Sequence, residues 1–217
     1  MNNWYLLIYI VFLLLIIFTC AYFKSIREGL TNMNNIVLIG DSILNNSSYV
    51  TSDKSVVGIL KTKTNNIFNF AKDGATINDC YNELNKIPLE LNKSDTYIFI
   101  SAGGNNILKN NIQLDESTIK TLFSDYMEFI KAVRTKFSSA KINILNLYMP
   151  SNPRYQSHKS SIDQWNNLIN QYSSKVGEMY NVINLNTLLT SSNDFVYDIE
   201  PSITASQKIA NVIYLTR

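Results

Sequence analysis

Residues 35–43 of the chain are NIVLIGDSI, a mostly apolar run from Asn35 to Ile39 followed directly by Gly40, Asp41 and Ser42. An apolar run that ends in turn-forming residues predicts a strand buried on both faces, as in a parallel sheet. A serine directly after such a strand lies at the sheet edge where parallel α/β proteins bind their ligands. We therefore expect this stretch to organise both the fold and the functional site.

The rest of the chain alternates β-rich runs with helical patterns. Further strands are expected at Ile67–Ala71, Thr96–Ser101, Lys141–Leu147 and Val182–Leu185, and helices at Ser52–Lys63, Thr76–Leu91, Leu114–Phe137, Ile162–Val176 and Ile203–Leu215. This alternation predicts an α/β domain in which right-handed crossovers place helices on both faces of a parallel sheet.

Four polar segments lie at the ends of the expected elements. They are Gly40–Ile43, Lys72–Ala75, Ala102–Asn106 and Tyr197–Ser202. Each segment alone is ordinary turn or N-cap chemistry, and Gly74 alone indicates no more than a positive φ. Because the segments follow one another at strand ends, we expect them to meet at one edge of the sheet.

In these segments the chain resembles the SGNH (GDSL-like) hydrolase family of serine esterases, lipases and acetylesterases, from about Asn34 to the C-terminus. The nucleophile motif of the family falls on Gly40-Asp41-Ser42, its oxyanion glycine on Gly74, and its Gly-x-Asn-Asp motif on Gly103, Gly104, Asn105 and Asn106. The resemblance implies an α/β, three-layer, flavodoxin-like parallel sheet of the SGNH hydrolase type over residues 35–217.

The resemblance also implies a mechanism. Ser42 attacks an ester carbonyl, while its own backbone N–H, the N–H of Gly74 and the side-chain amide of Asn105 hold the developing oxyanion. The implied substrate is an ester-bearing small molecule, a lipid or an acylated glycan. No cofactor and no metal are implied.

The final motif departs from the family pattern. Glu200 stands where the family has its catalytic histidine, and Asp198 lies two residues upstream rather than three, although Pro201 and the following helix match. In one interpretation Glu200 is the base, with its pKa raised by burial and by like-charge repulsion from Asp198. In the other, Glu200 caps the last helix or makes a surface ion pair, and Ser42 has no base.

His158 is the single histidine of the chain and the only other candidate for the base. It lies in the loop Ser151–Ser160 after the fourth expected strand, on the same sheet edge as the other motifs. The family does not place its base there, and a solvated loop histidine is the commoner outcome. The same loop offers Arg154 and Tyr155 as candidates for substrate contacts.

The N-terminal residues Trp4–Phe23 form an uncharged apolar run of about 20 residues, which is the length that crosses about 30 Å of hydrocarbon. We expect a single-pass membrane anchor over residues 1–23 and a polar tether over residues 24–34. A signal peptide cleaved near Thr19-Cys20-Ala21 and a buried core helix are the alternatives. Lys24 and Arg27 follow the apolar run and weakly favour a domain on the cytoplasmic side of the membrane. The Asn-x-Ser sequons would be meaningful only on the lumenal side, so the orientation stays open.

Composition excludes other function classes. Charged residues make up 17% of the chain and its formal net charge is +2, too little for the field of a nucleic-acid-binding protein. Two cysteines and one histidine are too few for a zinc site made of those residues.

Three functional hypotheses follow from the sequence. The first is a membrane-anchored ester hydrolase with a carboxylate base, and the second is an inactive relative that binds a glycan or a lipid. The third, a nucleotide-binding flavodoxin-like domain, is disfavoured because no Gly-x-Gly-x-x-Gly or Walker loop follows the first strand.

Overall fold

The computed structural model of the chain describes residues 3–31, 34–109, 113–176 and 180–217. The chain divides into two compact units, Met1–Asn34 and Asn35–Arg217. The second unit contains the α/β domain. It is described first because it carries the functional motifs.

The domain is built on a five-stranded sheet, β1 (Asn35–Gly40), β2 (Ile67–Asn69), β3 (Thr96–Ser101), β4 (Lys141–Leu145) and β5 (Tyr180–Ile183). The strand order is β2-β1-β3-β4-β5, and every neighbouring pair is parallel. This is the flavodoxin-like order, in which the chain reverses its direction of winding between β1 and β3. The loops after β1 and β3 therefore lie at the point where such sheets bind ligands.

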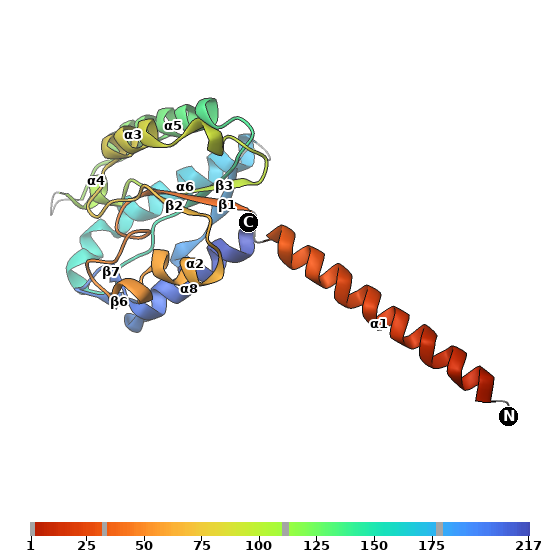
Figure 1. Cartoon of the computed structure of the whole chain (residues 1–217). Coiled ribbons are helices and arrows are strands. Elements are labelled where there is room, and N and C mark those ends of the chain that lie inside the picture. Colours follow the sequence, from red (N-terminus) through yellow and green to blue (C-terminus); the bar gives the residue numbers. More distant parts are fainter. Residues whose placement is uncertain (1–2, 32–33, 110–112, 177–179) are drawn as a thin grey trace. The chain divides into compact units, whose positions relative to one another are not determined.

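Helices cover both faces of the sheet, which gives three layers (Figure 1). One layer contains α3 (Ile77–Lys86), α5 (Glu116–Lys136) and α6 (Lys159–Val176), and the other contains α2 (Val56–Lys63) and α8 (Ile203–Thr216). Aromatic contacts between Phe123 and Trp165, with ring centroids 5.5 Å apart, join α5 to α6. Both faces of the sheet are thus covered, which explains why its strands are continuously apolar.

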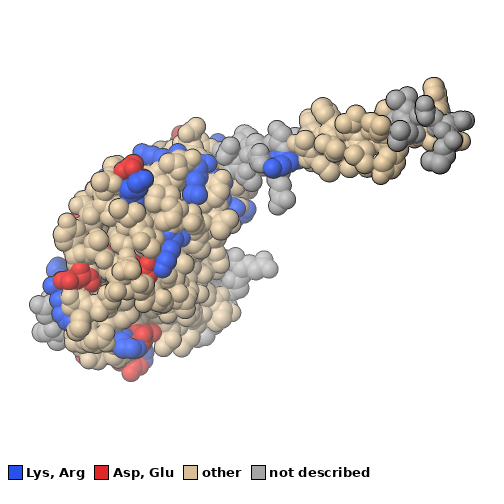
Figure 2. All heavy atoms as spheres, turned by 90° about the horizontal axis from the view of Figure 1, so that it is seen from below, with Lys and Arg blue, Asp and Glu red and all other residues tan. Residues whose placement is uncertain are grey.

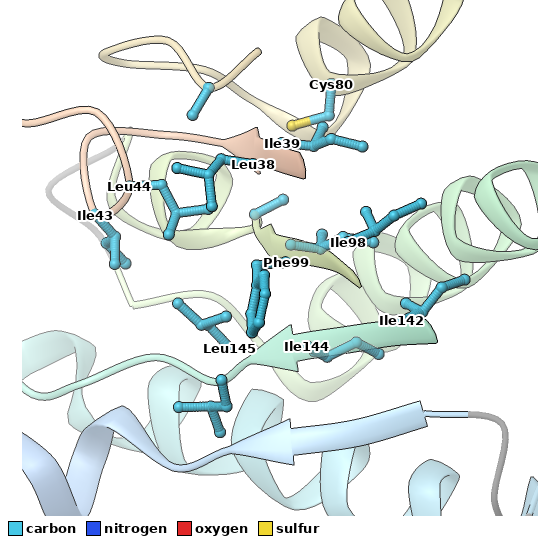
Figure 3. Packing of buried hydrophobic residues seen from close by; sticks show 14 of the residues in the cluster. Leu38, Ile39, Ile43, Leu44, Cys80, Ile98, Phe99, Ile142, Ile144 and Leu145 are labelled. Atoms are coloured by element: carbon cyan, nitrogen blue, oxygen red, sulfur yellow. The ribbon is translucent and has the colours of Figure 1, made fainter. Parts of the chain in front are cut away.

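The core is formed by the central strands and the apolar faces of the helices. Leu38, Ile98 and Phe99 have no exposed surface, and they lie among side chains from β1, β3 and β4 (Figure 3). Such close packing holds the carboxyl ends of β1 and β3 in one fixed arrangement.

Several elements are shorter than the sequence predicts. The expected helix over Thr76–Leu91 ends at Lys86, because Pro88 cannot continue it, and a 3-10 turn, η2 (Leu89–Leu91), follows. The first turn expected in Ser52–Lys63 is a separate 3-10 turn, η1 (Ser52–Lys54), because Ser55 caps α2 through the N–H of Gly58.

Short elements complete the domain. They are α4 (Gly104–Leu108), η3 (Pro153–His158), α7 (Leu185–Leu188), η4 (Ser192–Asp194) and a small antiparallel hairpin of β6 (Phe195–Val196) and β7 (Glu200–Pro201). The hairpin lies just before α8 and carries the final motif.

The described residues of the first unit form one helix, α1 (Asn3–Thr31), with exposed apolar side chains between Trp4 and Phe23. The helix runs through most of the expected tether, where Lys, Arg, Glu and Leu are good helix formers. Among the residues described, no helix combines the length and the apolar character needed to cross a membrane. The predicted single-pass anchor therefore has no support from the structure and stays a prediction.

The surface charges are mixed. Figure 2 shows Lys and Arg interspersed with Asp and Glu on one face of the domain, with wide neutral areas between them. This distribution agrees with the near-neutral formal charge of +2.

Candidate active site

The turn after β1 presents Ser42 and is held by Asp41. The Asp41 carboxylate accepts hydrogen bonds from the Ser101 hydroxyl (2.8 Å) and the Ile43 N–H (3.1 Å). Gly40 is required because a Cβ there would lie 2.0 Å from the carbonyl oxygen of Ser101. The ends of β1 and β3 therefore approach too closely for any residue with a side chain.

Ser42 opens into a pocket with about 450 Å³ of empty space, open solvent included. The walls of this Ser42 pocket are Asp41, Ser42, Ile43, Gly104, Asn105, Leu108, Leu147, Tyr148, Pro150, Ile162, Ile199 and Glu200. Residues from the ends of β1, β3 and β4 and from the β6–β7 hairpin thus meet in one place. Of the predicted site residues, the pocket brings together Ser42, Asn105 and Glu200.

Glu200 is partly buried beside Ser42. Burial raises the pKa of the Glu200 carboxyl above its usual 4.5, a hydrogen bond of the Ser42 side chain lowers it, and the negative charge of Asp73 raises it. The Oε2 atom of Glu200 is buried without a hydrogen-bond partner. A partly buried carboxylate beside a serine hydroxyl has the chemistry of a general base.

Asp198 faces away from this contact. Its carboxylate pairs with the Arg154 guanidinium (3.2 Å) and accepts a hydrogen bond from the Asn152 amide (2.7 Å). The like charge that raises the pKa of Glu200 comes from Asp73 rather than from the predicted Asp198. Asp73 is fixed by the Tyr49 hydroxyl, which donates to it at 2.6 Å.

Glu200 does not cap the last helix. The cap of α8 is Ser202, whose hydroxyl accepts a hydrogen bond from the Ala205 N–H at 3.2 Å. Among the ion pairs of the residues described, none involves Glu200. Glu200 therefore has neither of the two structural roles that the sequence allowed, a helix cap or a surface ion pair.

Asp41 is a second carboxyl group of unusual pKa. Complete burial raises its pKa to about 7, the hydrogen bonds from Ser101 and Ile43 lower it, and the charge of Glu200 raises it. Two carboxyl groups therefore flank Ser42, and the negative charge of Glu200 disfavours ionisation of Asp41.

Asn105 is presented by α4. Gly103 starts this helix with φ +103°, and a Cβ at Gly103 would lie 2.3 Å from the Trp165 ring. The Asn105 amide donates one hydrogen bond to the Ala75 carbonyl oxygen (3.0 Å), and an amide has a second N–H to offer. The neighbouring Asn106, which replaces an Asp of the motif, accepts a hydrogen bond from the Ile77 N–H (3.0 Å) at the start of α3.

Gly74 does not line the Ser42 pocket. It has φ +71°, a conformation that favours glycine, and it lines a separate depression with Lys72, Asp79 and Glu83. Within the described part of the chain, no protein acceptor takes the backbone N–H of Gly74 or that of Ser42. Both N–H groups are therefore available to a ligand.

His158 is buried at the end of η3, with 2% of its surface exposed and its Nδ1 without a hydrogen-bond partner. It is absent from the walls of the Ser42 pocket, and the expectation of a solvated loop histidine does not hold. Arg154 and Tyr155, the predicted substrate contacts, interact with each other at 2.5 Å and also lie outside those walls.

Sequence reasoning did not find Asp73, Tyr49, Ser101 or Tyr148. Ser101 could have been found, since it ends the strand that pairs with β1 and lies opposite Gly40. Asp73 lies within the predicted segment Lys72–Ala75 but had no role there, whereas Tyr49 and Tyr148 reach the site through the return of other loops. Among the residues described, no group of His, Cys, Asp and Glu side chains could hold a metal ion.

Solved structures share this architecture. A lipolytic protein of the G-D-S-L family from Veillonella parvula has 17% identity and a TM-score of 0.65, covering 84% of this chain and 96% of its own. The esterase EstA from Pseudoalteromonas sp. has 16% identity and a TM-score of 0.63 over 83% of this chain and 94% of its own. A lipase/acylhydrolase from Enterococcus faecalis has 20% identity and a TM-score of 0.63, covering 85% of this chain and 95% of its own.

At identities this low, the structural similarity shows a common fold. The search of curated proteins found no match to the chain. The family model does reach most of the sequence. The model of the GDSL-like lipase/acylhydrolase family matches residues 36–211, which include Ser42, Asn105 and Glu200. The chain therefore belongs to the GDSL-like lipase/acylhydrolase family.

Proposed function

We propose that this protein is a serine ester hydrolase in which Ser42 is the nucleophile and Glu200 the general base. One observation carries the proposal: Ser42 and Glu200 line the same pocket, and burial there raises the pKa of the Glu200 carboxyl group above its usual value. A serine hydroxyl is a weak nucleophile until a base takes its proton. A carboxylate with a raised pKa is a stronger base than an ordinary one.

The reaction follows from that pair. Ser42 Oγ adds to the ester carbonyl carbon, and its proton moves to the Glu200 carboxylate. Glu200 then gives this proton to the departing alkoxide as the ester C–O bond breaks, which leaves an acyl group on Ser42. A water molecule, deprotonated by Glu200, attacks the acyl carbon, and Glu200 returns the proton to Ser42 as the carboxylic acid leaves.

Three donors are proposed to hold the oxyanion. They are the N–H groups of Ser42 and Gly74, which have no protein acceptor in the described part of the chain, and the second N–H of the Asn105 amide. One donor of this kind is worth about 3 kcal/mol of barrier. Gly74 lies outside the pocket walls, so its N–H takes part only if it converges on the same oxygen atom as the donors of Ser42 and Asn105.

The pocket walls favour an apolar acyl group. Ile43, Leu108, Leu147, Pro150, Ile162 and Ile199 line it. We therefore propose an ester of a lipid or of an acylated glycan as substrate, with the acyl group against these side chains. Because the pocket is open on one side, the leaving group can remain in solvent.

Labelling of the active serine tests the proposal. The Pseudoalteromonas esterase is described as inhibited by monoethylphosphonate, a phosphorus analogue of an acyl group. A fluorophosphonate probe should label the full chain and its Ser47→Ala variant, since Ser47 is exposed in the same loop. It should not label Ser42→Ala. Absence of labelling of the wild-type chain from pH 5 to pH 9 would refute the proposed function.

A second candidate function is a binding protein that lacks catalysis. The observation that favours it is the position of His158, which is buried away from the Ser42 pocket and so supplies no imidazole base. If only the base is missing, Glu200→His should create esterase activity where the wild-type chain has none. If Glu200 is the base, the wild-type chain is already active.

We further propose that residues 1–23 hold the domain at a membrane as a single-pass anchor, on a side that the sequence leaves open. The support is the sequence alone, the uncharged apolar run Trp4–Phe23 with aromatic residues near both ends. The full chain should stay with the membrane fraction in alkaline carbonate and be released by detergent. Leu14→Arg together with Leu15→Arg should free it, and carbonate extraction of the wild-type chain would contradict the anchor.

A further inference from the structure

The hairpin that carries Glu200 has little structure of its own. Its two strands pair only Phe195 with Pro201 and Val196 with Glu200. A two-stranded ribbon this short is not stable by itself in water. The position of the Glu200 carboxylate must therefore be fixed by contacts from outside the hairpin.

The turn of the hairpin has a strained backbone conformation. Tyr197 and Asp198 have φ of +47° and +71°, and the Ile199 N–H donates to the Val196 carbonyl oxygen at 3.2 Å. These are the features of a type I′ turn, which fits a hairpin but is costly for a tyrosine. Such backbone persists only where surrounding structure holds it.

Two buried side chains supply that hold, one on each side of Glu200. The Tyr148 hydroxyl donates to the Ile199 carbonyl oxygen at 2.7 Å, and the Asn46 amide donates to the Pro201 carbonyl oxygen at 3.0 Å. Asn46 is fully buried and Tyr148 is 7% exposed. The carbonyl groups that flank Glu200 in sequence are thus each tied to a rigid part of the domain.

Every polar atom of the Asn46 side chain has a hydrogen-bond partner. Its amide also donates to the Ser206 hydroxyl (2.6 Å) in α8, and its side-chain oxygen accepts from the Val56 N–H (3.0 Å) in α2. Asn46 lies four residues after Ser42, so the loop that presents the nucleophile is bonded to the strand that presents the base. A buried group with all its partners is costly to remove, because each partner is left without a hydrogen bond.

Tyr148 keeps its proton in this position. Burial, followed by the negative charges of Glu200 and Asp41, raises the pKa of Tyr148 well above its usual 10. The hydroxyl therefore remains a donor throughout the neutral range. It lies just after β4, so this contact ties Glu200 to the central sheet.

We propose that Asn46 and Tyr148 are positioning residues that hold Glu200 against Ser42 from its two sides. This Glu200 clamp, defined as Asn46 and Tyr148, rests on the proposed function where it concerns catalysis. Its structural part, the placement of the Glu200 carboxyl group, does not depend on catalysis.

The test compares matched buried residues. Asn46→Leu removes the amide at nearly constant volume, and Tyr148→Phe removes only the hydroxyl. Asn146→Leu is the control for the first, because Asn146 is also fully buried but bonds to the loop of residues 184–186. Tyr126→Phe is the control for the second, because the buried Tyr126 hydroxyl has no partner in the described part of the chain.

The first readout is the titration of the Glu200 carboxyl group, followed by carbon NMR of the full chain and assigned with Glu200→Gln. In the wild-type chain the midpoint should lie above 4.5. The titratable groups that face Glu200 are unchanged in Asn46→Leu; they are Asp41, Asp73, Tyr49 and Tyr148. In this variant the titration midpoint of the released Glu200 carboxyl group should therefore move toward 4.5. Tyr148→Phe should move it in the same direction, and the two controls should not.

The second readout is a double-mutant cycle on the rate of fluorophosphonate labelling. Each clamp variant should lower the rate at least tenfold in the wild-type background and less than twofold in Glu200→Ala, because an effect carried through Glu200 disappears with it. A loss equally large in Glu200→Ala, or an unmoved Glu200 midpoint in both clamp variants, would overturn the clamp. A wild-type chain that never reacts would instead refute the proposed function, and the titration would still decide the clamp.

Discussion

The Ser101 hydroxyl donates a hydrogen bond of 2.8 Å to the Asp41 carboxylate, so the end of β3 holds the turn that carries Ser42. Both residues are buried. The contact joins the two strands at which the flavodoxin-like sheet reverses its direction of winding. Four predictions follow from this geometry and from that of the surrounding loops.

Ser101→Ala should destabilise the domain and slow the reaction of Ser42. The variant leaves a buried acceptor without its donor, which typically costs about 1–3 kcal/mol of unfolding free energy. Urea unfolding of the full chain measures this loss. Ser117→Ala is the control, because the Ser117 hydroxyl makes a similar bond to Asp115 at the exposed start of α5, and its effect should stay below about 0.5 kcal/mol.

Asp41 should make the domain less stable as the pH rises. The folded domain binds a proton at Asp41 up to about pH 7, whereas the unfolded chain releases it near 3.8. The stabilisation from the neutral carboxyl group is complete below about 3.8 and is lost by about 7, on the order of a few kcal/mol. Asp41→Asn should flatten this part of the stability profile. An unchanged slope in that variant would show that Asp41 is ionised throughout.

Asp73→Asn should shift the acid limb of the labelling rate to lower pH. The charge of Asp73 raises the pKa of Glu200, and the rate should rise with pH as Glu200 ionises. Removing that charge should bring the midpoint of this rise in labelling rate closer to pH 4.5, the usual pKa of a glutamate. An asparagine at this position can still accept the hydrogen bond from the Tyr49 hydroxyl. Asp53→Asn is the control, since Asp53 is exposed beside Lys54 and should leave the profile in place.

Gly103→Ala should damage both stability and activity, whereas Gly104→Ala should be mild. A methyl group at Gly103 would lie 2.3 Å from Trp165 at φ +103°, but at Gly104 its nearest neighbour is Leu147 at 3.4 Å. We expect a loss of about 1–3 kcal/mol for the first variant and less than about 1 kcal/mol for the second. Thermal unfolding and labelling rates measure the pair, and equal effects would contradict the close contact with Trp165.

Local pattern was sufficient for much of the fold. The apolar runs at Asn35–Ile39 and Thr96–Ser101 predicted buried parallel strands, and both are present in β1 and β3. Element ends were less accurate. The fourth strand ends at Leu145 rather than Leu147, because Asn146 turns its side chain to the N–H groups of Leu185 and Asn186. Such a bond depends on a residue about forty positions away, which no local periodicity reports.

The α/β class, the place of Ser42 at the end of the first strand and the resemblance to the family can all be predicted from the amino-acid sequence. These follow from apolar periodicity and short motifs, which are properties of neighbouring residues. Three placements are visible in the folded domain alone: Glu200 lies beside Ser42, Asp73 rather than Asp198 supplies the like charge, and His158 lies outside the pocket. The physical reason is that these placements depend on how loops far apart in the chain return to one sheet edge, where packing and burial set each carboxyl group's charge.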